Sequence, residues 1–117
     1  MIIIDYKDTR PIYEQVSEKF KLLILKGVLS ADEQMPSVRN LAMELSINPN
    51  TIQKAYADLE REGFIYTVKG RGNFVSGAEN LLLERRKSCM EKILALVKEA
   101  QEYGITREEI IDRIQKA

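Results

Sequence analysis

The sequence contains no histidine and a single cysteine, Cys89. This excludes the His/Cys clusters of zinc sites and the histidine-based triads and acid–base pairs of many hydrolases. Cys89 cannot form an internal disulfide, and on a helix we expect it to be a small packing residue. Carboxylates are scattered among Lys and Arg along helix faces, as on solvated surfaces. We therefore predict a protein that is not an enzyme and carries no metal or cofactor.

Long apolar runs and an excess of charge are also missing. No apolar stretch approaches the roughly 20 residues that a membrane-spanning helix needs, and residues 2–4 are too few for the core of a signal peptide. Basic and acidic residues number 18 each, so the formal net charge is +0, which argues against binding nucleic acid through bulk charge. We expect a cytoplasmic protein without a membrane partner. Its 117 residues leave room for one compact domain with an appendage, or for two small units.

Apolar residues recur at helical spacing in segments that begin with cap residues. Ser37 is a good N-cap, and Asn48 followed by Pro49 combines a cap with a preferred first helical residue. Thr106 with Glu109 is a capping-box signature. The predicted helices cover about residues 11–26, 38–45, 49–62, 80–102 and a final stretch from residue 106.

A glycine-turned β-hairpin is predicted after the third helix. Residues 64–68 are β-prone, residues 69–72 form a turn with two glycines that can take positive φ, and residues 73–75 supply the return strand. Residues 2–4 are a weaker strand candidate. Two short helices followed by a hairpin are the layout of a winged helix, so the predicted fold class is mainly α (α+β), a winged helix-turn-helix followed by two C-terminal helices.

The third predicted helix begins with polar residues, at the end where a helix in the major groove meets base edges. Asparagine and glutamine can pair with adenine, while arginine suits guanine or a phosphate. No acid occurs from Ile47 to Ala57 or from Gly63 to Ala78, so a basic surface can form locally. Cations at the hairpin tip can enter a minor groove or grip phosphates. The predicted DNA-binding residues are Ser37, Arg39, Asn48, Asn50, Thr51, Gln53, Lys54, Tyr56, Lys69, Gly70 and Arg71.

Several of these residues have a purely structural alternative. Asn48 is also what any helix start would use, and a tight hairpin requires Gly70 whatever its function. Tyr56 is either a core residue or a hydroxyl that contacts a phosphate.

The composition changes after a small-residue break at residues 76–78. The two helices beyond it are too small to bury their aliphatic residues alone, so they should pack on the first unit or on another copy of the chain. We predict a homodimer through them; completion of the monomer's own core is the alternative. The predicted domains are a winged-helix DNA-binding domain at residues 1–77 and a helical dimerisation region at residues 78–117. The predicted dimerisation residues are Leu83, Met90, Ile93, Leu94, Val97 and Ala100.

These motifs together resemble the GntR family of bacterial transcription regulators, and in particular its YtrA subfamily. The residues that carry the resemblance are Pro11-Ile12-Tyr13-Glu14-Gln15, Met35-Pro36-Ser37-Val38-Arg39, Asn48-Pro49-Asn50-Thr51, Ala55-Tyr56, and Gly70-Arg71-Gly72 with Phe74-Val75. The resemblance implies a dimeric, repressor-type regulator that binds a palindromic double-stranded operator. The recognition helix would enter the major groove, and the wing would meet the minor groove or phosphates.

The chain departs from the family pattern in the loop before the second helix. Ala31-Asp32 stands where a proline-glycine turn is common, and Met35 replaces the usual leucine, which leaves the shape of this loop open. A second interpretation from another class is a winged-helix protein-interaction module that does not bind DNA, which the zero net charge favours. A small-molecule effector is possible, but nothing in the sequence indicates one.

Overall fold

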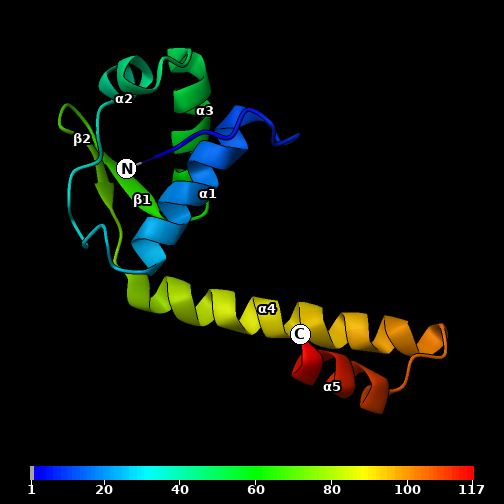
Figure 1. The fold of residues 1–117 in the computed structure, drawn as a ribbon. Coiled ribbons are helices and arrows are strands. Elements are labelled where there is room, and N and C mark those ends of the chain that lie inside the picture. The colour runs from blue at the N-terminus through cyan, green and yellow to red at the C-terminus, as the bar shows by residue number, and fades with distance from the viewer. Residues whose placement is uncertain (1) are drawn as a thin grey trace. The chain divides into compact units, whose positions relative to one another are not determined.

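The computed structural model describes residues 2–117. Its elements are α1 (Ile12–Leu25), α2 (Val38–Leu45), α3 (Pro49–Arg61), β1 (Ile65–Val68), β2 (Gly72–Val75), α4 (Ala78–Glu102) and α5 (Arg107–Lys116). The fold is the predicted winged helix followed by two helices (Figure 1). The chain divides into two compact units, residues 1–81 and 82–117, and α4 passes from the first into the second.

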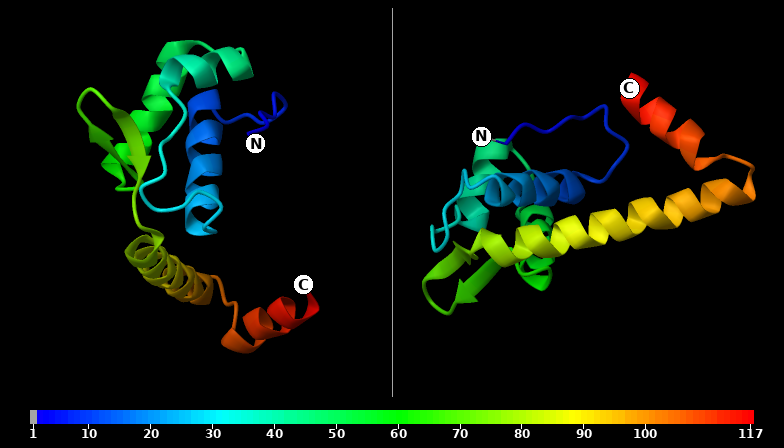
Figure 2. Two further views of the ribbon diagram at one scale, coloured as in Figure 1. Left: turned by 90° about the vertical axis from the view of Figure 1, so that its left-hand side faces the viewer. Right: turned by 90° about the horizontal axis from the view of Figure 1, so that it is seen from below.

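The core of the first unit lies between α1, α3 and the hairpin. α1 and α3 pack side by side (Figures 1 and 2). Apolar residues at helical spacing on α1, Val16, Phe20 and Ile24, are fully buried, as are Ile52 and Leu59 on α3. Burying each of these side chains contributes about 1.5–3 kcal/mol. This packing fixes the orientation of α3, the predicted recognition helix.

Residues 2–4 do not form the strand that their β-branched side chains suggested. Ile2 packs into the core while Ile3 is exposed. The segment is held by the buried Gln15 on α1, whose Nε2 donates to the Asp5 carbonyl and whose Oε1 accepts from the Asp5 N–H, both at 3.0 Å. A β-prone segment forms a strand only where a neighbouring strand can satisfy its backbone hydrogen bonds, and these residues do not pair with one.

Both helices of the helix-turn-helix, α2 and α3, are capped at their N-termini as the sequence predicts. The Ser37 hydroxyl accepts from the Asn40 N–H at 3.1 Å, and Asn48 Oδ1 accepts from the Asn50 N–H at 2.8 Å. Ser46 follows α2 in the left-handed conformation, with φ of 55°, which is uncommon for a residue other than glycine. The turn allows α3 to cross α2 as in a helix-turn-helix.

The loop before α2 pairs with the wing. β1 and β2 are antiparallel, and Gln34 forms an isolated bridge with Phe74 on β2. Asp32 has a φ of 66°, so it takes the left-handed conformation that a glycine would adopt without strain. Its carboxylate accepts from the Tyr66 hydroxyl at 2.7 Å. Met35, which replaces the leucine of the family pattern, is buried in the core.

The second unit contains most of α4 and all of α5, which turns back and diverges from α4 (Figures 1 and 2). The predicted capping box is present, because the Thr106 hydroxyl accepts from the Glu109 N–H at 3.1 Å and Glu109 Oε1 accepts from the Thr106 N–H at 3.2 Å. The proposed domain boundary after residue 77 is the start of α4, whereas contacts assign residues up to Leu81 to the first unit. Across residues 2–117, no helix has the length and apolar character needed to cross a membrane.

Candidate nucleic-acid interface

The first turns of α3 present polar side chains to solvent. Asn50, Gln53 and Lys54 are exposed and Thr51 is half-buried. Within the described residues, the side chains of Asn50, Thr51 and Gln53 make no hydrogen bond to the protein. The first turn of α3 contains no acid. Free amide and hydroxyl groups at a helix N-terminus can pair with base edges or with a phosphate.

The two cap residues have a structural role that leaves part of their hydrogen-bonding capacity free. Ser37 and Asn48 each use a side-chain oxygen as an acceptor within the protein. The Ser37 hydroxyl can still donate its proton, and Asn48 retains its amide N–H groups. Both residues are exposed, so their capping role does not prevent contact with DNA.

The tip of the wing is exposed, and the side chain of Gln34 contacts its backbone. Lys69, Gly70 and Arg71 are all exposed, and Gly70 has a φ of 78°, which a residue with Cβ rarely adopts. Gln34 Nε2 donates to the Arg71 carbonyl at 2.9 Å. A Cβ on Gly72 would lie only 3.0 Å from that same nitrogen. Gln34 was not predicted from the sequence, because its partner lies on a distant segment.

The cations of this surface are not neutralised by the protein. Among residues 2–117, Arg39, Lys69 and Arg71 form no ion pair. By contrast, Asp58 on the second half of α3 is engaged with α1. Asp58 Oδ2 accepts from the Ser17 hydroxyl at 2.9 Å and lies 3.7 Å from Lys21 Nζ.

The pKa of Asp58 reports the balance of these contacts. Burial opposes ionisation of this carboxyl, but the hydrogen bond from Ser17 and the charges of Lys21 and Arg61 outweigh it, so the pKa lies below its ordinary value. Arg61 also pairs directly with Asp58, and Lys21 with Glu62. Lys21 on α1 is thus joined to Asp58 on α3 and to Glu62 at the C-cap of α3, whereas the Arg61–Asp58 pair lies within α3.

Tyr56 does not lie on the exposed surface, which corrects its prediction as a DNA contact. Its side chain is 2% exposed and meets Phe20 edge to face, with ring centroids 5.9 Å apart. Its hydroxyl donates to the Pro36 carbonyl at 2.7 Å. Burial raises the pKa of Tyr56 far above its ordinary value. Tyr56 is therefore a core residue that ties α3 to the loop in front of α2.

Like Gln34, Tyr13 makes a contact near this surface that the sequence did not predict. Lys54 Nζ lies over the Tyr13 ring, 4.1 Å from its centroid, within the range of a cation–π contact. The available signal was Tyr13's place in the motif at residues 11–15, but the motif does not reveal which residue of α3 it meets.

The predicted residues gather at one end of the first unit. The N-terminus of α3, the N-terminus of α1 and the tip of the wing all lie toward its upper end in Figure 1 and in the left view of Figure 2. The structure thus brings amides, hydroxyls and unpaired cations together on one end of a neutral protein.

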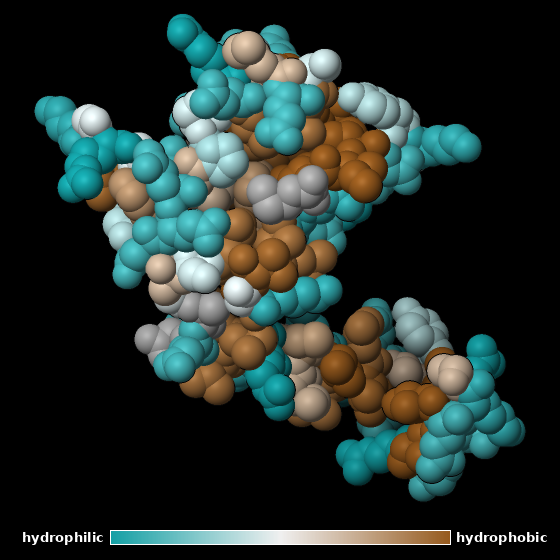
Figure 3. All heavy atoms as spheres, turned by 60° about the vertical axis from the view of Figure 1, so that its left-hand side comes forward, coloured by the Kyte–Doolittle hydropathy of each residue, from teal (hydrophilic) through white to brown (hydrophobic). Residues whose placement is uncertain are grey.

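The second unit exposes a different kind of surface. Large apolar side chains on α4, including Leu83, Met90, Ile93 and Leu94, are 48–65% exposed, while Val97 and Ala100 are half-buried. None of the residues of α5 is buried. Figure 3 shows apolar side chains exposed on this unit.

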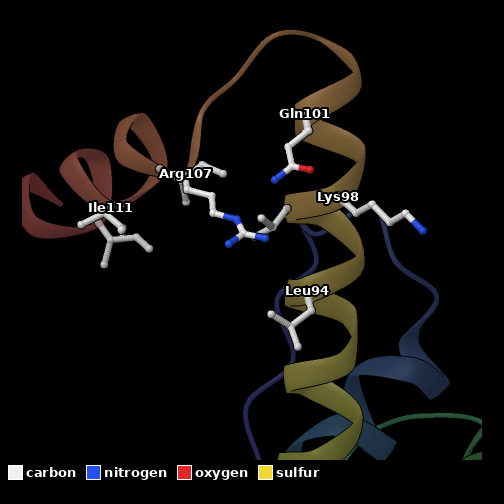
Figure 4. A pocket seen from close by; sticks show the side chains of 8 residues that line it. Leu94, Lys98, Gln101, Arg107 and Ile111 are labelled. Atoms are coloured by element: carbon white, nitrogen blue, oxygen red, sulfur yellow. The ribbon is translucent and has the colours of Figure 1, made fainter.

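A groove of about 710 Å³ lies between α4 and α5. Leu94, Val97, Ile110, Ile111 and Ile114 form its apolar lining, together with Lys98, Gln101 and Arg107. Figure 4 shows Leu94, Gln101 and Arg107 directed into the space between the helices, while the ammonium group of Lys98 points away from it.

Comparison with known proteins relates the whole chain to transcription regulators. The family model described as bacterial regulatory proteins, gntR family, matches residues 12–75. The transcriptional repressor YtrA of Bacillus subtilis (strain 168) is 40% identical over 118 residues, which cover 99% of this chain and 91% of YtrA.

Two solved structures extend the comparison. A transcriptional regulator from Oenococcus oeni has a TM-score of 0.75 and 30% identity, covering 99% of this chain and 98% of that one. The AraR DNA-binding domain in complex with operator ORE1 has a TM-score of 0.56 and 30% identity, covering 65% of this chain and 93% of that one.

The fold, the exposed polar surface and these relatives define a winged-helix transcription regulator. The chain belongs to the gntR family of bacterial regulatory proteins, and within that family to the YtrA subfamily.

Proposed function

We propose that this DNA-binding transcription regulator is a repressor that recognises a palindromic operator as a homodimer. The first turns of α3 lie in the major groove, and Asn50, Thr51 and Gln53 meet base edges. Arg39 and Lys54 contact phosphates or guanine beside them. The wing, through Lys69, Gly70 and Arg71, meets the minor groove or the phosphates.

The observation that carries this proposal is the combination of free side-chain amides and unpaired cations at one end of a structure with zero net charge. Packing explains the core residues of the first unit, but within the described residues no internal hydrogen bond or ion pair accounts for these amides and cations. The operator complex of the related AraR domain supports DNA as the partner. The function is regulatory rather than enzymatic, and we assign it to the cytoplasm.

Pairing of two chains through the second unit follows from its exposed apolar side chains. An apolar face of this extent is costly to leave in water. The two helices make no core of their own, since α5 buries no residue. A second copy would cover the groove between α4 and α5 and the stripe along α4. Two recognition helices related by a two-fold axis then read two half-sites.

Salt dependence of DNA binding tests the proposal. Binding to DNA selected from a random pool is measured by fluorescence anisotropy from 50 to 300 mM salt, and scrambled DNA of equal length serves as the control. The slope of the logarithm of the binding constant against the logarithm of the salt concentration is expected to be about −0.9 for each phosphate neutralised. It would be about −3.6 per protomer if Arg39, Lys54, Lys69 and Arg71 each neutralise one phosphate. The proposal fails if the selection yields no DNA and the protein shows no salt-dependent binding. That result would favour a protein-interaction module, the function that agrees with the zero net charge.

A further inference from the structure

The first turns of α1 and α3 meet beside the proposed DNA-contacting residues. Pro11 at the N-cap of α1 and Ile12 and Tyr13 in its first turn line a shallow cavity of about 420 Å³ together with Asn50, Thr51 and Lys54 from α3. Lys54 Nζ lies over the face of the Tyr13 ring in this place. The residue that meets Lys54 therefore comes from outside the helix-turn-helix.

The Tyr13 ring is held in place by its own surroundings. It is half-buried, and its hydroxyl donates to Glu14 Oε1 at 3.3 Å. The chain that precedes α1 is fixed by the two hydrogen bonds between Gln15 and the Asp5 backbone. Burial, followed by the charge and hydrogen bond of Glu14, raises the pKa of Tyr13 above its ordinary value.

An aromatic ring differs from an acid as a partner for a lysine that must bind DNA. Within residues 2–117, Lys54 forms no ion pair. The ring face attracts the ammonium group without neutralising its charge and without accepting its N–H groups in hydrogen bonds. A lysine side chain loses much rotamer freedom when it binds, and a contact formed beforehand reduces this loss.

We propose that Tyr13 is a positioning residue, whose ring holds the Lys54 ammonium group in place to meet a phosphate of the operator. This inference rests on the proposed function. It assigns to α1 a part in DNA recognition that requires no contact between Tyr13 and DNA.

The test compares Tyr13→Phe, which keeps the ring, with Tyr13→Leu, which removes it, each alone and combined with Lys54→Ala. Operator affinity is measured by anisotropy, and thermal melts show that each variant is folded. We expect Tyr13→Phe to bind like the wild type and Tyr13→Leu to bind roughly two- to five-fold more weakly, the effect of one exposed cation–π contact. In the Lys54→Ala background, Tyr13→Leu should cause no further loss. As a matched control, its loss should persist in full in a Lys69→Ala background.

A second readout needs no DNA. In NMR spectra of the free protein, the Lys54 ε-methylene protons should be shifted upfield by the ring in the wild type and in Tyr13→Phe, but not in Tyr13→Leu. Equal losses for Tyr13→Phe and Tyr13→Leu would assign the effect to the hydroxyl and overturn the inference. So would unchanged or tighter binding by Tyr13→Leu, an undiminished loss in the Lys54→Ala background, or an absent ring shift. Wild-type protein that binds no DNA overturns the proposed function as well.

Discussion

Replacing Tyr56 by phenylalanine removes one oxygen from the centre of the helix-turn-helix. The ring and its edge-to-face contact with Phe20 remain, so little packing is lost. What disappears is the hydrogen bond of 2.7 Å to the Pro36 carbonyl. Loss of such a bond, with a part-buried acceptor left unsatisfied, costs about 1–3 kcal/mol. For a domain of this size, each 1 kcal/mol lowers Tm by roughly 4–8 °C.

The same variant makes a second prediction at high pH. Because burial raises the pKa of Tyr56 in the folded chain, the unfolded state loses this proton first. The stabilising contribution of the neutral phenol is therefore complete below the unfolded pKa of about 10 and is lost as the pH rises beyond it. Urea unfolding followed by circular dichroism between pH 7 and 11 should show a smaller alkaline loss for Tyr56→Phe than for the wild type.

Tyr66→Phe is the matched control. Its hydroxyl also donates a hydrogen bond, to Asp32, but the side chain is exposed, so its effect should be well below that of Tyr56→Phe. If Tyr56→Phe left both the stability at pH 7 and its alkaline dependence unchanged, the reasoning that Tyr56 is a hydrogen-bonded core residue would be refuted.

Three further predictions concern other parts of the molecule. Asp58→Ala should lower the free energy of unfolding by about 1–3 kcal/mol at pH 7. Because the folded pKa of Asp58 is lowered, this difference is complete above a pH of about 4 and should shrink as urea titrations are taken below it. Arg71→Ala should weaken binding to selected and scrambled DNA alike and reduce the salt slope by about 0.9; altered base preference in a repeated selection would contradict a contact that does not depend on sequence. Ile93→Asp should give monomers in sedimentation equilibrium while Glu91→Gln, on an exposed neighbouring position, keeps the wild-type mass; an unchanged mass for Ile93→Asp would mean that the stripe on α4 does not pair two chains.

The parts of the fold that the sequence predicted well depend on residues close together in the chain. The caps at Ser37, Asn48 and Thr106 each involve a partner within three residues, so their side chains and spacing identify them. The wing is equally local, since β1 and β2 are joined by only three residues, 69–71, and Gly72, which the sequence placed in the turn, is the first residue of β2.

The features that sequence reasoning missed depend on contacts between distant segments. The run at residues 2–4 has strand propensity, but among the described residues the only sheet is the β1-β2 hairpin and the run is not part of it, so Ile2 packs into the core instead. The Tyr56 hydroxyl finds its acceptor on Pro36, and the Tyr13 ring finds Lys54, only because the helices pack as they do. In the same way, Gln34 reaches the Arg71 carbonyl across the wing. Propensity and periodicity do not encode such pairs.

The roles of single residues on the proposed DNA surface require DNA to be present. Asn50, Thr51 and Gln53 all lie in the first turns of α3, and within the described residues none of their side chains has an internal hydrogen-bond partner; Asn50 and Gln53 are exposed, while Thr51 is half-buried. These properties identify the three residues as candidates for contact with DNA. They do not show which of the three contributes most to binding.

The most direct test of the account is the affinity of Asn50→Ala for selected and scrambled DNA at one salt concentration. Asn50 is exposed, and in the part of the chain that the structure describes its side chain makes no internal hydrogen bond, so the variant should fold and dimerise as the wild type does. We predict that it binds the selected operator about 1–3 kcal/mol more weakly while its affinity for scrambled DNA hardly changes, because an amide that reads a base contributes only where that base is present. An equal loss on both DNAs, or no loss on either, would contradict the claim that this end of α3 reads sequence.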